Sequence, residues 1–196
     1  MILKIDQSVH DINLEPFLSY GSPDTKGYLI LGAGVDQYKL LACLSHQLPL
    51  GSHVGDLGTF YGNSAIALAS NPAISVLTCD TTDHVRGECI GYRNMGNIAY
   101  QRCPAIELLP LLINSPLIVV DIGLHTGPLE QEVLDYLIAH RYKGIAVFDD
   151  IHYSEGMKAF WNNIKLKKFD VTSIGHWSGT GIVVFDPSTI DVEVNL

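Results

Sequence analysis

The chain has 196 residues, and its 21 acidic and 12 basic side chains give a net charge of −9. Such a length suits one domain, residues 1–196. Hydrophobic residues make up 47% and charged residues 17% of the chain, which excludes a disordered chain and a coiled coil. The acidic balance argues against nucleic acid and anionic membranes as partners, so we expect a small-molecule ligand.

Cysteine usage and the N-terminus predict a cytoplasmic location. Cys43, Cys79, Cys89 and Cys103 show neither a C-x-x-C pair nor zinc-like spacing. Most of them lie in or beside apolar runs, where a free cysteine behaves as a small hydrophobe. The opening stretch MILKIDQSVHDINLEP has acidic residues where a secretory signal needs an apolar segment, and no apolar run approaches the ~20 residues of a membrane helix.

Beyond residue 34 the pattern alternates between helices and strands. Residues 1–34 are expected to be irregular, and residues 35–48 show helical spacing of leucines that ends at Pro49. Short apolar runs alternating with helical patterns are typical of parallel α/β sheets. The predicted strands are HVGDL, VLTCD, NIAYQ, PLIVVDI and GIAVFD, and the predicted helices are NSAIALAS, a stretch near 83–96, residues 128–141 and SEGMKAFWNNI, which Ser154 would cap.

The C-terminal segment is predicted to close the sheet. DVTSIGHW and TGIVVFD, separated by Ser178-Gly179, indicate an antiparallel hairpin, with His176 and Trp177 packed beside it. Phe160 and Trp161 are expected in the core. In open, mostly parallel sheets ligands bind at the carboxyl ends of the strands, so chemistry is expected there.

The strongest motif is GDLGTFYGNSAIALA, residues 55–69, at a predicted strand-to-helix junction. Gly58 and Gly62 allow a sharp turn and a close approach to a ligand. Asp56 adds a negative charge, the loop has no Lys or Arg, and the G-K-[ST] ending of a phosphate loop is absent. The motif favours a cationic ligand without a pyrophosphate; a plain connection between strand and helix is the alternative.

A second glycine-rich stretch, Leu31-Gly32-Ala33-Gly34, is a weaker match to a dinucleotide fingerprint. Its third glycine position is Gln37, and it precedes the first predicted strand. We therefore expect it to lead into the next helix.

Asp80 ends the second predicted strand of the alternating region. An acid at that place typically accepts hydrogen bonds from ribose hydroxyls. The alternative is an aspartate that caps a turn or a helix.

Three more acids follow predicted strands: Asp121 after LIVV, and Asp149 and Asp150 after IAVF. Neighbouring carboxylates repel each other unless a cation or a proton intervenes, and a cluster of oxygens suits Mg²⁺. The sequence therefore predicts a metal site of these three acids, with a capped loop as the alternative for the adjacent pair. His125 and His152 flank the acids, and each is either a general base or a loop residue satisfied by hydrogen bonds.

These motifs together resemble the class I S-adenosylmethionine-dependent methyltransferases. Within that class, the chain is similar to the metal-dependent O-methyltransferases of the catechol and caffeoyl-coenzyme A type and to bacterial small-molecule and sugar O-methyltransferases. DLGTFYGNSAIALA is similar to the first motif, D/E-x-G-x-x-x-G-x-S, and Asp80, VVDIG and VFDDIH follow at matching intervals. The resemblance implies an α/β, Rossmann-like three-layer sandwich with a seven-stranded, mostly parallel sheet whose last strand is antiparallel. We expect residues 1–48 to form a cover segment with a helix, and residues 49–196 to form the catalytic core.

The resemblance also implies roles for single residues. Gly58, Phe60 and Ser64 would line the methionine end of S-adenosylmethionine, Asp80 would hold its ribose, and Ala105-Ile106 would border its adenine. Asp121, Asp149 and Asp150 would match the metal ligands, with an aspartate where the catechol enzyme has asparagine. The whole set expected at the cofactor is Asp56, Gly58, Thr59, Phe60, Tyr61, Gly62, Ser64, Asp80, Ala105 and Asp121.

One departure from the family concerns the general base. The catalytic lysine of the catechol enzyme corresponds here to Leu124, so the catalytic candidates are His125, His152 and Asp121. The implied reaction is in-line methyl transfer to a hydroxyl of a sugar, a polyketide or a catechol-like phenol, which Mg²⁺ or a similar cation would acidify. A non-catalytic cofactor-binding module and a nucleotide-dependent oxidoreductase stay open as alternatives. The apolar Met1–Gly34 segment is compatible with a homodimer.

Overall fold

A computed structural model shows the fold and describes residues 1–32, 34–84 and 91–196. Ala33, Cys89 and the middle of the helical stretch expected near 83–96 lie outside these ranges. At the end of that stretch, Gly91–Asn94 forms a 3-10 helix.

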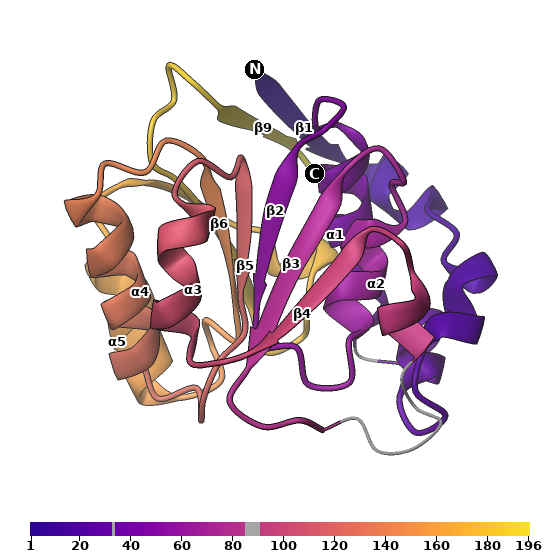
Figure 1. Ribbon diagram of the computed structural model, residues 1–196. Helices are drawn as coiled ribbons and strands as arrows, with labels where there is room; N and C mark the ends of the chain where they lie inside the picture. Colours follow the sequence, from indigo (N-terminus) through magenta and orange to yellow (C-terminus); the bar gives the residue numbers. More distant parts are fainter. Residues whose placement is uncertain (33, 85–90) are drawn as a thin grey trace.

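A seven-stranded sheet forms the centre of the molecule (Figure 1). Its strands are β2 (His53–Leu57), β3 (Ser75–Asp80), β4 (Ile98–Arg102), β5 (Leu117–Val120), β6 (Ile145–Asp149), β7 (Lys167–Asp170) and β8 (Thr180–Val184). They lie in the order β4-β3-β2-β5-β6-β8-β7. The strands from β4 to β6 are parallel, and β8 runs antiparallel to β6 and β7. The predicted sheet, mostly parallel with its last strand antiparallel, is confirmed.

Helices cover both faces of this sheet, which makes three layers (Figure 1). In the described parts of the chain the α-helices are α1 (Val35–His46), α2 (Asn63–Ala69), α3 (Ala105–Leu112), α4 (Pro128–Ala139) and α5 (Glu155–Asn163). α1 and α2 lie on one face, and α3, α4 and α5 lie on the other. Ser154 caps α5 as predicted, because its hydroxyl accepts from the Met157 amide at 3.1 Å. The sequence did not predict α3, whose Pro110 interrupts the helical pattern.

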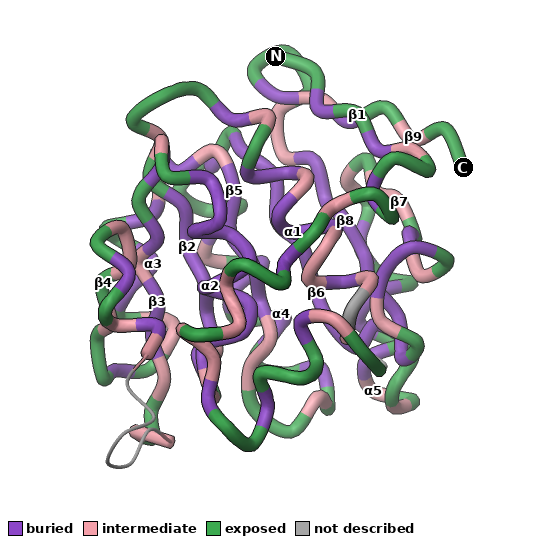
Figure 2. Tube along the Cα trace, turned by 90° about the vertical axis from the view of Figure 1, so that its right-hand side faces the viewer, coloured by how far each residue is buried: buried purple, intermediate pink, exposed green. Residues whose placement is uncertain are grey.

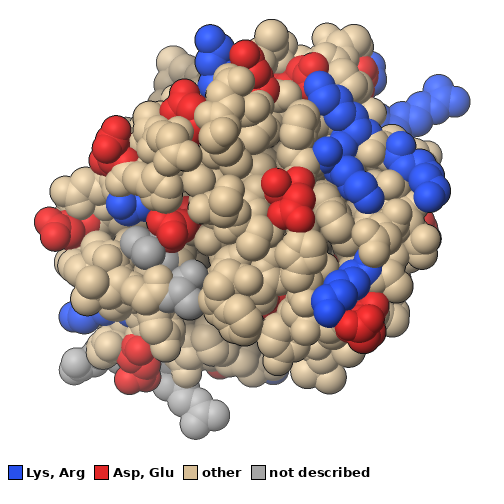
Figure 3. All heavy atoms as spheres, turned by 180° about the vertical axis from the view of Figure 1, so that it is seen from behind, with Lys and Arg blue, Asp and Glu red and all other residues tan. Residues whose placement is uncertain are grey.

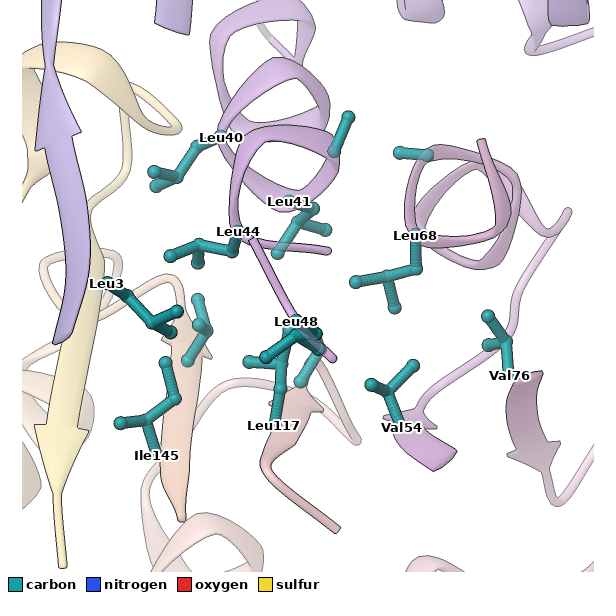
Figure 4. Packing of buried hydrophobic residues seen from close by; sticks show 14 of the residues in the cluster. Leu3, Leu40, Leu41, Leu44, Leu48, Val54, Leu68, Val76, Leu117 and Ile145 are labelled. Atoms are coloured by element: carbon teal, nitrogen blue, oxygen red, sulfur yellow. The ribbon is translucent and has the colours of Figure 1, made fainter. Parts of the chain in front are cut away.

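The apolar strands are buried because alternate residues face opposite helical layers. In β5, Leu117 and Val119 belong to the cluster that includes α1, whereas Ile118 and Val120 belong to the cluster with α3, α4 and α5. Figure 4 shows Leu41 and Leu44 between α1 and the sheet residues Leu117 and Ile145. The tube in Figure 2 shows buried residues along the strands and exposed residues concentrated in the connections. Phe160 and Trp161 are buried on the second side, as predicted.

The N-terminal segment is more regular than the sequence predicted. β1 (Ile2–Asp6) pairs in parallel with β9 (Asp191–Asn195) as a separate two-stranded sheet (Figure 1). Short 3-10 helices at Gln7–Asp11, Glu15–Tyr20 and Lys26–Leu29 then lead to α1. The strand was missed because its pairing partner lies at the other end of the chain, where no local pattern points to it.

The predicted hairpin is present, but its first strand lies earlier in the chain than expected. β7 ends at Asp170, and Thr172–Ile174 forms a 3-10 helix where the sequence suggested strand. The Asp170 carboxylate accepts hydrogen bonds from both the amide and the hydroxyl of Thr172, at 3.1 and 2.5 Å. Such a local side-chain bond competes with the strand ladder and ends the strand.

Charge is distributed unevenly over the fold. On the face drawn in Figure 3, lysines and arginines gather toward one side, while acidic side chains are scattered between large uncharged areas. None of the helices described by the structure is long and apolar enough to cross a bilayer.

Candidate active site

A cavity of about 920 Å³ lies at the carboxyl ends of β2, β3, β5 and β6. Its volume is near the top of the usual range for small-molecule sites, ~300–1,000 Å³. The N-terminal turn of α1 closes one side of it with Gln37 and Tyr38. The sequence-predicted residues that line it are Gly58, Thr59, Phe60, Tyr61, Ser64, Asp80, Ala105, Ile106, Asp121, His125, Asp149 and Asp150.

The glycine loop between β2 and α2 depends on two left-handed glycines. Gly58 has a φ of +99°, and a Cβ there would lie 1.6 Å from the carbonyl oxygen of Asp121. Gly62 has a φ of +88°, and a Cβ there would lie 2.6 Å from the ring of Tyr92. Only glycine fits either position. Gly62 therefore serves the packing of the loop, since it does not line the cavity.

Asp80, at the end of β3, connects that strand to the glycine loop. Its Oδ2 accepts from the Phe60 amide at 2.9 Å, and its Oδ1 accepts from the Thr82 amide at 3.0 Å. Phe60 has a positive φ of 45°, and its exposed ring contacts those of Tyr61 and His84. A carboxylate and an aromatic group thus stand side by side at the edge of the cavity.

Asp56 lies beneath the glycine loop and does not line the cavity. The residue is fully buried, and the Thr78 hydroxyl donates to its Oδ2 at 2.7 Å. Burial raises the pKa of Asp56 to about 6, although the hydrogen bond from Thr78 acts in the opposite direction. This corrects the expectation that the Asp56 carboxylate faces a cationic ligand.

The structure brings Asp121, Asp149 and Asp150 together with two histidines. His125 approaches Oδ1 of Asp121 with its Nε2 at 3.8 Å and Oδ2 of Asp150 with its Nδ1 at 3.3 Å. His176 approaches Asp149 Oδ1 and Asp150 Oδ1 with its Nδ1, at 3.5 and 3.4 Å. Two overlapping groups, Asp121–His125–Asp150 and Asp149–Asp150–His176, each hold ligand atoms within 4.8 Å of one another.

Strained backbone gathers at this cluster. His125 and Asp150 have positive φ angles of 51° and 60°, which non-glycine residues rarely adopt. The Ser154 hydroxyl donates to the carbonyl of His125 at 2.6 Å and thereby connects this loop to α5. Such strain persists only where surrounding contacts enforce it, and it is concentrated at functional sites.

His176 is a site residue that sequence reasoning missed. The sequence placed it beside the hairpin, whereas it lines the cavity against the two acids at the end of β6. Ser178, also unpredicted, donates its hydroxyl to Asp150 and lies 2.5 Å from His176 Nδ1. The β6–β8 pairing brings both residues here, and no local signal in the sequence indicates that pairing.

The acids of the cluster differ in proton affinity. Burial, and then the charges of Asp149 and Asp150, raise the pKa of Asp121 well above its ordinary value. Burial also acts to raise that of Asp150, but hydrogen bonds with His176 and Ser178 lower its pKa overall. Burial disfavours the charged form of His176, yet its hydrogen bonds to the two acids raise its pKa to about 10.

His152 lies elsewhere than expected for a catalytic base. Its Nε2 lies 2.7 Å from Asp170 Oδ2, at the end of β7, and the residue does not line the cavity. The backbone of the loop after Asp150 pairs with the hairpin turn, since the His152 amide donates to the Ser178 carbonyl at 2.8 Å. This placement corrects the expectation that His152 is a catalytic candidate equal to His125.

Several buried polar atoms beside the cavity have no hydrogen-bond partner among the described residues. They include Thr25 Oγ1 and Asn63 Oδ1, and both residues line the cavity. Buried polar groups are nearly always satisfied, so these atoms indicate a place for a polar ligand.

No protein-family model and no curated protein sequence matches the chain. Solved structures match its fold. A methyltransferase from Geobacter sulfurreducens has a TM-score of 0.61 and 12% identity, over 92% of this chain and 98% of that one. A Podospora anserina methyltransferase bound to SAH has a TM-score of 0.57 and 13% identity, over 93% and 89%. A provisionally named O-methyltransferase from Klebsiella pneumoniae has a TM-score of 0.54 and 16% identity, over 92% and 90%. The chain thus shares the fold of these methyltransferases, as the resemblance of its motifs implied.

Replacing Gly58 with alanine should destabilise the protein by at least ~2 kcal/mol, because the new methyl group meets the Asp121 backbone and the left-handed conformation is strained. Gly96→Ala is the matched control, since nothing lies within 4 Å of a Cβ there. Urea unfolding of both variants measures the difference. Equal free energies of unfolding for the two would contradict this account of the loop.

Asp56→Asn should remove a pH-dependent loss of stability. The native pKa of Asp56, about 6, lies above its ordinary value of 3.8, so the native state binds the proton more tightly and stability falls as pH rises between these values. From pH 4 to pH 7 the variant should gain about 2–3 kcal/mol relative to the wild type. Denaturant unfolding of both proteins at each pH checks this. A stability difference independent of pH would show that Asp56 titrates normally.

Proposed function

We propose that the protein is an S-adenosylmethionine-dependent methyltransferase that acts on a hydroxyl oxygen of a small molecule with the help of a divalent cation. The observation that carries the proposal is one cavity that joins the glycine loop and Asp80 to the acid–histidine cluster. It offers a nucleoside site and a proton-handling site in contact with each other. The methyltransferase fold, shared with a neighbour that holds SAH, supports this choice of cofactor.

The glycine loop and the end of β3 would hold the nucleoside part of the cofactor. Each Asp80 oxygen accepts one backbone N–H and keeps a lone pair that suits a ribose hydroxyl. Ala105 and Ile106, at the start of α3, line the apolar side of the cavity where an adenine ring would pack.

The orphaned polar atoms fit the amino-acid end of the cofactor. Asn63 Oδ1 and Thr25 Oγ1 lack partners in the described structure, and both residues lie at the cavity with Ser64. An ammonium group and a carboxylate would supply the missing hydrogen bonds. These residues belong to the first turn of α2 and to the cover segment, so the cofactor would bind between them. When bound, S-adenosylmethionine supplies an electrophilic methyl group.

Asp121, Asp149 and Asp150 would hold the cation. Asp150 belongs to two groups of ligand atoms, one with Asp121 and His125 and the other with Asp149 and His176, and the atoms of each group lie within 4.8 Å of one another. A divalent cation bound there would acidify a hydroxyl group. The donors present therefore fit the metal that the resemblance implies.

His125 is the proposed general base. It lines the cavity beside the acids, and no described lysine or arginine lines the cavity with it. Its imidazole would take the proton of the acceptor hydroxyl while the Ser154 hydroxyl holds the His125 backbone in place. The acids on either side would stabilise the resulting positive charge.

The acceptor is proposed to be an uncharged hydroxylated molecule. The described cavity lining carries Asp80, Asp121, Glu132, Asp149 and Asp150 and lacks Lys and Arg. An acceptor that carries a phosphate group, such as a coenzyme A ester, would be repelled by the acids near the cluster. Exposed apolar side chains at the cavity, such as Tyr28 and Leu124, would cover the acceptor. A sugar and a phenol both fit these requirements.

Isothermal titration with S-adenosylhomocysteine tests cofactor binding. We expect the wild type to bind and Asp80→Asn to bind about ten-fold more weakly, because the carboxylate is the stronger ribose acceptor. Asp11→Asn, an exposed substitution at the end of the first 3-10 helix, serves as the control and should bind like the wild type. No binding to the wild type would refute the proposed function.

Methyl transfer to a panel of neutral sugars and catechols tests the chemistry. His125→Ala should lower kcat about 10²–10⁴-fold, as loss of a general base does, whereas His152→Ala should stay near the wild-type value. Treatment with a chelator should abolish transfer, and added divalent cation should restore it. Equal losses in the two histidine variants would contradict the assignment of the base. Full activity in chelator would contradict the metal.

A further inference from the structure

His176 lies against the two adjacent acids at the end of β6. Its Nδ1 lies 3.5 Å from Asp149 Oδ1 and 3.4 Å from Asp150 Oδ1. Adjacent ligands of an octahedral ion with bonds of ~2.1 Å are about 3 Å apart, so these separations are close to those of a shared ion. Both carboxylates are buried, with side chains 7% and 10% exposed.

The backbone of His176 is held by a buried chain of hydrogen bonds. The His176 amide donates to Thr180 Oγ1 at 2.7 Å, and that hydroxyl donates to Gln37 Oε1 at 2.9 Å. Thr180 is fully buried and stands opposite Asp149 in the β6–β8 register. The backbone that carries the imidazole is therefore held by α1 and β8, and Ser178 Oγ lies 2.5 Å from the ring Nδ1. Preorganisation of this kind is what metal ligands require.

His125 and His176 approach different oxygens of Asp150. His125 faces Oδ2 from a strained loop, with its Nδ1 at 3.3 Å. His176 faces Oδ1, to which the Ser178 hydroxyl donates. In this arrangement the imidazole of His125 is available to the acceptor hydroxyl, whereas the imidazole of His176 lies against Asp149 and Asp150.

We propose that His176 is a nitrogen ligand of the divalent cation, so that the site is a mixed imidazole–carboxylate centre that selects a transition metal such as Mn²⁺ or Fe²⁺ over Mg²⁺. This inference rests on the metal in the proposed function. Mg²⁺ prefers oxygen ligands, whereas imidazole nitrogen favours the transition metals.

Pulsed electron paramagnetic resonance of Mn²⁺ bound to the chelator-stripped full chain tests the nitrogen ligand. Protein labelled with ¹⁵N only in histidine should show ¹⁵N coupling to the ion, and unlabelled protein should show ¹⁴N coupling. The measurement uses the wild type, so it does not depend on the folding of a variant. Absence of histidine coupling would overturn the proposal.

Variants then identify the histidine. In His176→Ala the coupling should disappear and Mn²⁺ affinity should fall at least about ten-fold, with a smaller change for Mg²⁺. The coupling should persist in His125→Ala and in His140→Ala, a control at the exposed C-terminal end of α4. Coupling that is retained in His176→Ala, or lost only in His125→Ala, would overturn the assignment.

Parallel assays in the same preparation separate this inference from the proposed function. Methyl transfer that is supported equally well by Mg²⁺, with no histidine coupling to Mn²⁺, would refute the nitrogen ligand and leave the proposed function standing. Histidine coupling without binding of S-adenosylhomocysteine would support the ligand assignment and refute the methyltransferase.

Discussion

The backbone of Gly58 passes so close to Asp121 that a methyl group at residue 58 would lie 1.6 Å from the Asp121 carbonyl oxygen. The Asp121 amide in turn donates to the Leu57 carbonyl at 2.9 Å, at the ends of the neighbouring strands β2 and β5. This contact joins the glycine loop to the first acid of the cluster. The proposed nucleoside end and the proposed reacting end of the cavity therefore share one edge of the sheet, and the proposed methyl transfer requires that the two ends keep their relative positions.

Several carboxylates gathered at one edge of the sheet repel one another and lose contact with water, which destabilises the folded state. The fold compensates for this differently at each carboxylate. Asp56 is buried beneath the loop with Thr78 as its hydrogen-bond donor. Asp150 is stabilised by Ser178 and His176, which keep it ionised despite burial. No hydrogen bond from a described residue reaches the Asp121 carboxylate, and burial together with the neighbouring acids raises its pKa. The least compensated carboxyl group thus lies in the cavity, where a cation would stabilise it most.

The two ends of the chain contribute directly to the site. α1 supplies Gln37, which supports the hairpin through Thr180, and the hairpin supplies His176 and Ser178. α1 and the last strands of the sheet are therefore connected by this chain of hydrogen bonds beside the cavity. A substitution in α1 can alter the acid–histidine cluster without touching a proposed metal ligand, because the hydrogen-bond chain is buried and continuous.

The sequence by itself determined the sheet and most of the loops at its carboxyl edge. Apolar alternation and turn residues indicate β2 to β6, and strand-end acids such as Asp80 and Asp121 follow from the same reading because parallel strands end at one edge. Tertiary structure decided which side chains face the cavity. Asp56 turns inward, His152 pairs with Asp170, and His176 joins the acids through the β6–β8 register. Local patterns encode the period of an element, whereas side-chain direction and long-range pairing depend on packing between segments that are distant in the chain.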